Sequence, residues 1–346
     1  MNERLVLRPV RDEDAPRLIA LIGAAYDEYP GCVLDLPELD DDLPVPATTA
    51  ARRGGRWWVL EDEGRLVGSV GTGALQDDGS VELKRLYVAA SHRRRGLASL
   101  LVGRVEAQAA GVGASRVVLW SDTRFLDAHR LYTGAGFVDT GARRDLHDPS
   151  HTTEIEFAKP VEVEPSLHAV RSWDGPFGVE QVRWLDLPDG ASFLGEVPGT
   201  GDDHLGGPVA YTVEVDDAWR TRRATVAGPH GRQVLTSDGA GRWWRDGEPA
   251  DDLAGCLDVD VEVTPLTNTL PIRRAGAGDV RAAWVRVPGP TIEPLGQTYT
   301  DEGGGRWTYR SGGGFVADLT VDDDGLVVDY AAVDDAGTRT AVWSRR

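Results

Sequence analysis

The chain has 346 residues, of which 41% are hydrophobic and 27% charged, a composition typical of a folded protein with room for two hydrophobic cores. The formal net charge is −19. It arises from 25 acidic against 20 basic residues in 1–160 and 31 against 17 in 161–346. Such an acidic surface repels phosphate backbones and anionic headgroups, which argues against nucleic acids and membrane surfaces as partners.

Targeting and redox signals are missing from the sequence. No stretch approaches the roughly 20 apolar residues that a membrane span needs, and the start, Met1 to Leu5, does not resemble a signal peptide. Cys32 and Cys256 lie far apart, and the seven histidines show no metal-ligand spacing. We therefore expect a cytoplasmic protein with two reduced cysteines, no bound metal and no membrane span.

The first part of the chain alternates strand and helix patterns. A helix is predicted to begin at Asp12, and the Pro- and Asp-rich residues 30–48 are expected to form a loop with at most a short helix. The other expected elements are a hairpin at 57–75, strands at 4–10, 81–88, 116–120 and 137–140, and helices at 97–110 and 126–132. This order predicts an α+β fold for residues 1–159, with a mixed sheet flanked by helices.

A basic glycine turn lies between the strand at 81–88 and the helix at 97–110. It reads Arg93-Arg94-Arg95-Gly96-Leu97-Ala98 and fits the pattern R-x-x-G-x-A. A turn of this kind directs backbone N–H groups and the helix dipole at one point, which suits a pyrophosphate. By itself, a basic loop before a helix is also compatible with a solvated cap.

Three features together resemble the GNAT acetyltransferase superfamily over residues ~1–158. They are the strand–turn–helix around Gly96, the segment 131–137 with its Tyr-x-x-x-Gly-Phe pattern, and the preceding hairpin at 57–75. The resemblance implies that acetyl-CoA, as co-substrate, lies in a V-shaped opening between two strands. By that implication the pantetheine pairs with Leu86 and Val88, and residues Arg93, Arg94, Arg95, Gly96, Leu97 and Ala98 surround the pyrophosphate.

The resemblance also implies catalytic roles for two residues. Tyr132 is the expected proton donor to the CoA sulfur, and Glu82 is the expected base for the acceptor amine. Their alternatives are a packed aromatic ring and an ordinary strand glutamate. Phe125 stands where many members of the family have an Asn that contacts the cofactor. The polar residues around 143–154 either shape the acceptor pocket or form a solvated terminal hairpin.

The pattern changes after residue 159. Prolines and alternating charges predict an extended linker over 160–174, and residues 175–346 show short strands separated by Gly and Asp. This pattern predicts an all-β antiparallel, barrel-like domain. Eight of the eleven tryptophans lie after residue 159 and suit either a packed core or a lined cavity.

Residues 256–274 stand out in this second part. Strict alternation would place Leu257, Val259, Val261 and Val263 on one strand face and Asp258, Asp260 and Glu262 on the other. A polar turn bracketed by two prolines and then Arg273 and Arg274 follow. The acidic face is either solvated on an edge strand or paired. The two arginines would then either grip phosphate or sugar oxygens at a cavity mouth, or brace the acidic strand.

This stretch, together with 217–222, 284–287 and 309–315, resembles a family of bacterial glycolipid-binding domains over roughly residues 175–346. The resemblance implies an open or closed antiparallel barrel and a lipid-like or glycolipid ligand. The whole chain is thus expected to be an N-acetyltransferase acting on a small-molecule or peptide amine, fused to a ligand-binding domain. The alternative is a non-catalytic acyl-CoA sensor that binds a ligand or serves a structural role.

Overall fold

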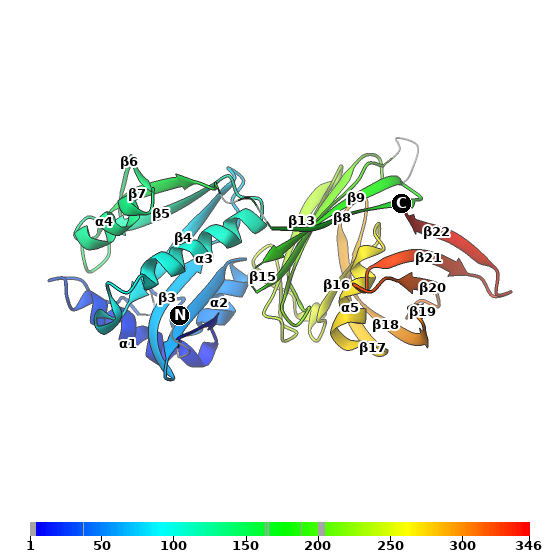
Figure 1. Cartoon of the computed structure of the whole chain (residues 1–346), viewed down its shortest axis with the longest axis horizontal. Helices are drawn as coiled ribbons and strands as arrows, with labels where there is room; N and C mark the ends of the chain where they lie inside the picture. Colours follow the sequence, from blue (N-terminus) through cyan, green and yellow to red (C-terminus); the bar gives the residue numbers. More distant parts are fainter. Residues whose placement is uncertain (1–4, 37, 163, 165, 188, 200–204) are drawn as a thin grey trace. The chain divides into compact units, whose positions relative to one another are not determined.

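The structure is a computed structural model that describes residues 5–36, 38–162, 164, 166–187, 189–199 and 205–346. The chain divides into two compact units, Met1–Pro165 and Ser166–Arg346. Figure 1 shows the first unit in blue to green-cyan and the second in green to red. Among the described residues, no helix combines the length and the apolar character that crossing a bilayer requires.

The first unit is built on a seven-stranded sheet of order β1-β2-β3-β4-β5-β7-β6. Only the β4–β5 pair is parallel. The strands are β1 (Leu5–Pro9), β2 (Arg56–Asp62), β3 (Arg65–Thr72), β4 (Ser80–Val88), β5 (Arg116–Asp122), β6 (Val138–Asp145) and β7 (Thr153–Pro160). The helices are α1 (Ala15–Tyr26), α2 (Pro46–Arg52), α3 (Leu97–Gly111) and α4 (Leu126–Gly134), with single turns η1 (Asp12–Asp14) and η2 (Ala90–His92). The mixed sheet with flanking helices predicted from the sequence is confirmed.

Helices cover both faces of this sheet because apolar residues occur on both sides of its strands. Trp57 and Trp58 are consecutive in β2 and therefore point to opposite faces. Trp57 belongs to a buried cluster with Leu18 and Ile22 of α1, whereas Trp58 belongs to a cluster with Leu101 of α3. The clusters thus place α1 on one face and α3 on the other.

The second unit contains one fifteen-stranded sheet of order β15-β14-β13-β12-β11-β10-β9-β8-β22-β21-β20-β19-β18-β17-β16. Its strands are β8 (Ser166–Gly175), β9 (Gly178–Leu187), β10 (Gly190–Val197), β11 (Val209–Asp216), β12 (Thr221–Gly228), β13 (Gly231–Ser237), β14 (Trp243–Arg245), β15 (Glu248–Pro249), β16 (Asp258–Val261), β17 (Gly278–Arg286), β18 (Thr291–Gly303), β19 (Arg306–Ser311), β20 (Val316–Val321), β21 (Val327–Val333) and β22 (Arg339–Arg345). Single turns η3 (Asp251–Leu253) and η4 (Leu266–Asn268) and the short helix α5 (Thr269–Ala275) complete it.

The predicted strand-rich character is confirmed, but the barrel is not. The described strands form a sheet with two ends, β15 and β16, so no closed barrel is found. The β16–β17 pair is parallel, which also departs from an all-antiparallel arrangement. The described strands β8–β15 and β16–β22 form two parts of this sheet, which are joined by the pairing of β8 with β22. That pairing consists of Ser344↔Asp174 and Arg345↔Trp173.

Part of the expected linker is a strand of the second unit. β8 pairs with β9 from Ser166↔Asp186 to Gly175↔Gly178, and the side chain of Trp173 is completely buried in the core. β7 ends at Pro160 and β8 begins at Ser166, so both strands take in residues of the expected linker 160–174. The strand was not apparent in the sequence because polar and apolar residues alternate poorly along it.

The acidic strand of the second unit is not solvated. In β16, Val259 and Val261 are buried on one face, and Asp258 on the other face is only 1% exposed. The polar turn expected after this strand is instead the η4 turn and helix α5, which packs against β16. Burial on both faces makes the solvated-edge interpretation wrong.

Candidate functional site

A cleft opens in the first unit because the two central strands diverge. β4 and β5 pair from Ser80↔Arg116 to Leu83↔Leu119, and the pairing goes no further. In β4 the residue after Lys84, Arg85, has a left-handed φ of 54°, and the register with β3 shifts there. A non-glycine residue in this region interrupts the regular pleat. The second half of β4 therefore leaves β5.

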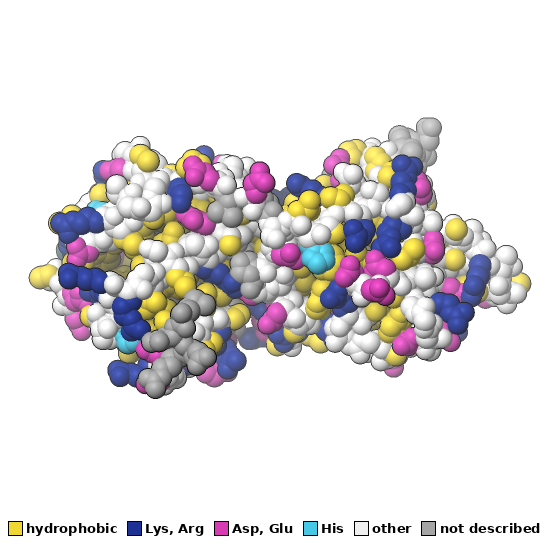
Figure 2. Space-filling view, in the orientation of Figure 1, with side chains coloured by type: hydrophobic (Ala, Val, Ile, Leu, Met, Phe, Trp, Pro, Cys, Tyr) yellow, Lys and Arg dark blue, Asp and Glu magenta, His cyan; other side chains and the backbone are white. Residues whose placement is uncertain are grey.

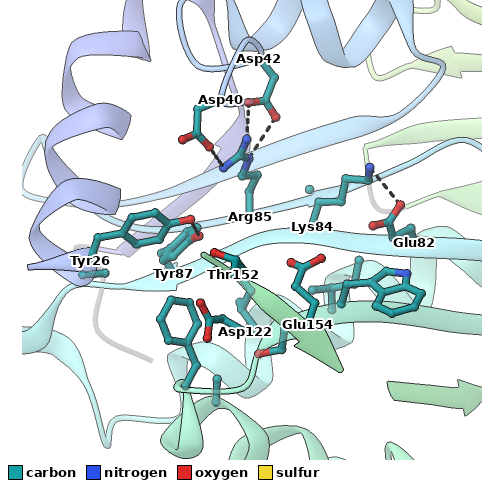
Figure 3. Close-up of a pocket in the computed structure, with 18 of the residues that line it drawn as sticks. Tyr26, Asp40, Asp42, Glu82, Lys84, Arg85, Tyr87, Asp122, Thr152 and Glu154 are labelled. Carbon is teal, nitrogen blue, oxygen red and sulfur yellow. Dashed lines mark hydrogen bonds and ion pairs between the residues drawn. The ribbon is translucent and has the colours of Figure 1, made fainter. Parts of the chain in front are cut away.

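A cavity of about 570 Å³ occupies this opening (Figure 3). Its wall includes most of the residues singled out in the sequence. Among the lining residues are Tyr26, Tyr29, Glu82, Leu86, Val88, Arg93, Ala98, Trp120, Asp122, Phe125, Tyr132, Arg144 and Glu154. The sequence-predicted catalytic pair and the expected cofactor contacts Leu86, Val88, Arg93 and Ala98 thus share one cavity.

The basic turn has a strained, open backbone. Arg94 has φ 58° and Gly96, which precedes the first residue of α3, has φ 77°. A Cβ atom built on Gly96 would meet no atom within 4 Å, so the space beside the turn is empty. Arg94 and Arg95 are exposed. A helix N-terminus with this open approach suits an anionic group.

Two residues of the turn contact other parts of the first unit. Leu97 is 6% exposed and packs with Leu60 and Val67, which anchors α3 to the sheet. Arg93 donates from Nε to the Val88 carbonyl oxygen at 3.2 Å and pairs with the Glu28 carboxylate at 2.6 and 2.7 Å. The carboxylate of Glu28 raises the pKa of Arg93, so its charge is held at the end of β4.

A buried arginine ties a loop to the cleft. The Arg85 guanidinium donates to Asp40 at 2.7 Å and to Asp42 at 2.6 and 3.0 Å, as the dashed lines of Figure 3 show. These two carboxylates raise the pKa of Arg85 despite its burial. The loop that precedes α2 is thereby fixed against the strand that bounds the cavity.

Aromatic side chains form one side of the cavity. Phe125 lies 4.5 Å from Tyr29 and 6.0 Å from Tyr26 between ring centroids. Tyr132 of α4 is 7% exposed and lies about as close to Phe137 and Phe157, at 6.0 and 5.9 Å. Burial raises the pKa of Tyr132, so its hydroxyl keeps its proton at neutral pH.

Carboxylates from three strands face the other side of the cavity (Figure 3). Glu82 on β4 pairs with Lys84 Nζ at 2.9 Å, and Asp122 on β5 is 5% exposed. Glu154 on β7 accepts from Arg144 Nε at 2.6 Å. Burial, and then the charge of Glu82, raise the pKa of Glu154 above its ordinary value. Sequence reasoning placed Glu154 only in a polar region, because no local motif marks it.

The two arginines of the second unit have different surroundings. Arg274 donates to the buried Asp258 carboxylate at 2.6 and 3.0 Å and so braces β16. Arg273 is exposed, and its guanidinium lies 4.0 Å from the Trp219 ring and 5.6 Å from the Trp184 ring. Trp219 adopts φ 62°, a rare conformation for a large side chain.

Basic and acidic side chains are interspersed on the face of each unit drawn in Figure 2.

Each part of the chain matches a known family model. Residues 21–137 match the model described as "Acetyltransferase (GNAT) family", and residues 171–334 match that described as "Putative glycolipid-binding". Human N-acetyltransferase 8 is 33% identical over 36% of this chain and 56% of its own length. Zebrafish (Danio rerio) N-acetylaspartate synthetase is 35% identical over 38% of this chain and 48% of its own length. The chain spans about half the length of these curated relatives.

Solved structures resemble part of this chain. A DUF1089 family protein from Pseudomonas aeruginosa is 31% identical and covers 44% of this chain and 88% of its own, with a TM-score of 0.38. A GNAT acetyltransferase from Staphylococcus aureus Mu50 is 16% identical over 46% of this chain and 99% of its own, with a TM-score of 0.40. A putative acetyltransferase from Salmonella typhimurium was solved with its cofactor acetyl-CoA. It is 18% identical and covers 46% of this chain and 95% of its own, with a TM-score of 0.38.

Proposed function

We propose that the first unit, whose residues 21–137 match the GNAT acetyltransferase model, transfers the acetyl group of acetyl-CoA to an amine. The observation that carries this proposal is the divergence of β4 from β5 beside the turn at Gly96. It leaves backbone groups of β4 facing a cavity that continues to Tyr132.

In this proposal the cofactor follows β4 into the cleft. The backbones of Leu86 and Val88 would pair with the pantetheine, and the N–H near Val88 would polarise the acetyl carbonyl. The turn from Arg93 to Ala98 would hold the pyrophosphate at the N-terminus of α3. Arg94 and Arg95 add exposed positive charge there, while Arg93 shapes the turn through Glu28 and Val88.

Two side chains would serve the reaction directly. Tyr132 would protonate the departing thiolate, since its buried hydroxyl lines the cavity and keeps its proton. Glu82 would draw the acceptor ammonium to the opening and assist its deprotonation from the start of β4. The acceptor is a small-molecule or peptide amine whose identity this geometry does not select.

Calorimetry with acetyl-CoA tests the proposal on the full-length chain. Gly96→Asp adds a negative charge and a Cβ atom at φ 77°, and we expect at least about tenfold weaker binding, which is about 1.4 kcal/mol. Gly103→Ala, within the helix α3 that follows Gly96 and with equally open space around its Cβ, should bind as the natural chain does. Equal affinity of all three proteins, or no binding by the natural chain, would refute the site.

We further propose that the second unit takes a glycolipid or similar ligand at Arg273. Arg274 is committed to the Asp258 carboxylate, whereas Arg273 is exposed beside two indole rings and donates to the main-chain carbonyl oxygen of Asp324. A guanidinium with aromatic neighbours suits sugar or phosphate oxygens next to apolar surface. A dispersed galactolipid should change the tryptophan emission of the natural chain and of Arg286→Ala, which removes another exposed arginine over an indole ring, but not of Arg273→Ala. No response from the natural chain would contradict ligand binding.

A further inference from the structure

Glu154 lies among the charged residues of the cleft, a position that no local sequence motif predicts. In the sheet it lies directly opposite Asp122 of β5 and directly opposite Arg144 of β6. Directly opposed residues of antiparallel strands project their side chains from the same face. All three side chains line the cavity, and Figure 3 shows Glu154 between Asp122 and Glu82.

The carboxylate of Glu154 is held by a fixed partner. Arg144 Nε donates to Glu154 Oε2 at 2.6 Å, and the Arg144 guanidinium lies 4.3 Å from the centre of the Trp120 ring. A stacked guanidinium has little freedom, so it fixes the orientation of the carboxylate. The side chain of Glu154 is 15% exposed. Glu82 is 25% exposed and pairs with Lys84 Nζ at 2.9 Å, and the side chains of Arg144 and Lys84 are 43% and 47% exposed.

The charged groups around Glu154 come from every neighbouring strand. Arg144 faces it from β6, Asp122 from β5 and Glu82 from β4. Asp122 is itself paired with Arg124 at the end of β5. Burial together with the two nearby carboxylates raises the pKa of Glu154 although Arg144 opposes the shift. A base works best when its pKa approaches the working pH, and this environment moves Glu154 in that direction.

We propose that Glu154 is the residue that accepts the proton of the acceptor ammonium, and that Arg144 is its positioning residue. This assignment rests on the proposed acetyl transfer and names the proton acceptor of its first step. Glu82 then contributes negative charge near Glu154 and the ammonium, and takes no proton itself.

The step balances as follows. The ammonium gives one proton to Glu154, and the neutral nitrogen forms a C–N bond to the thioester carbonyl carbon. The C–S bond then breaks, the thiolate takes a proton from Tyr132, and Tyr132 regains one from the nitrogen that has become an amide. Glu154 finally releases its proton to water, so that one amide, one CoA thiol and one proton are formed.

The experiment uses the full-length chain with acetyl-CoA and a panel of amines, with CoA thiol release as the signal. The panel holds alkyl amines, which are protonated near pH 7, and anilines, which are already neutral. For the alkyl amines, we expect Glu154→Gln to lower kcat/KM near pH 7 by ~10²–10⁴ and to move the rise of kcat/KM to the higher pH at which the amine itself loses its proton, because only the neutral amine then reacts. For the anilines we expect a much smaller loss, because their nitrogen needs no prior deprotonation.

Two further variants separate a catalytic from a structural role. Glu82→Gln should shift the rise of kcat/KM to lower pH, because removing a negative neighbour lowers the pKa of Glu154, with a much smaller loss of rate. Glu154→Asp keeps the carboxylate and should recover part of the rate for alkyl amines. Calorimetry with acetyl-CoA should give the same affinity for all variants.

The outcomes distinguish this assignment from the proposed function. Turnover of alkyl amines by Glu154→Gln with an unchanged pH profile would overturn the assignment and leave acetyl transfer intact. A large loss in Glu82→Gln without a loss in Glu154→Gln would give the proton to Glu82 instead. Binding of acetyl-CoA without turnover of any amine would overturn the proposed transfer itself, and this assignment with it.

Discussion

A buried glutamate makes the stability of the second unit depend on pH. Glu180 of β9 is 1% exposed, and the hydroxyl of Tyr211 donates to its Oε1 at 2.5 Å. Burial raises the pKa of Glu180 to about 7, and hydrogen bonds from Thr264 and Tyr211 oppose this only in part. The folded chain therefore holds a proton on Glu180 at pH values at which an unfolded chain has lost it.

The sign and size of the effect follow from this difference. Below pH 4.5 the Glu180 carboxyl is protonated in both states, so it has no net effect on the free energy of unfolding. Between 4.5 and about 7 only the folded state keeps the proton, and stability falls as pH rises. With about 1.36 kcal/mol per pH unit, the full loss is about 3 kcal/mol. Asp260, whose pKa burial raises to about 6, adds a loss of the same sign.

The comparison of Glu180→Gln with the natural chain isolates the contribution of Glu180. Urea unfolding of the full-length chain at pH 4.5 and pH 8, followed by tryptophan emission, reports mainly on the second unit, which holds eight of the eleven tryptophans. We expect the pH-dependent loss to be about 3 kcal/mol smaller in Glu180→Gln than in the natural chain. An equal loss in both proteins would show that Glu180 is ionised in the folded state and would refute the reasoning.

Three further changes have defined outcomes. Tyr132→Phe removes the proposed donor and should lower kcat by ~10²–10⁴ with unchanged acetyl-CoA affinity by calorimetry; an unchanged rate would exclude the acid role. Arg274→Met leaves the Asp258 carboxylate, which is 1% exposed, without its cation and should cost about 3–5 kcal/mol in urea unfolding. Adding Asp258→Asn to Arg274→Met should restore most of this loss, and a double variant as unstable as the single one would contradict the ion-pair explanation.

The structural features that could be predicted from the sequence are those that depend on local residue patterns. Trp57 and Trp58 begin an apolar strand, Gly96 marks a turn that needs a positive φ, and the helix after it repeats leucines at helical spacing. Each of these signals depends on residues close in sequence. The element order of the first unit and the turn beside its cleft therefore followed from the sequence and its resemblance.

The features that the sequence missed or left open depend on contacts across the fold. The sequence left open whether Asp258 is solvated or paired with an arginine, and Arg274 decides this; Glu154 looks like part of a surface hairpin until it meets Asp122 and Arg144 across the sheet. Whether the sheet closes into a barrel was also not predictable. The strand pattern indicates many short strands but does not show whether the first and the last of them pair. Burial and register decide these points, and neither is visible from spacing alone.

Arg85 connects the backbone of the cleft with its charges. Its left-handed φ of 54° is unfavourable for a long side chain, and its guanidinium is buried, so neither feature would persist without compensation. Asp40 and Asp42 supply it, with hydrogen bonds of 2.6 to 3.0 Å that hold the guanidinium in place. The irregular residue is thus fixed at the point where β4 stops pairing with β5. A regular β4 paired along its whole length would close the opening, which indicates that the loop carrying the two aspartates helps to keep the cleft available to a ligand.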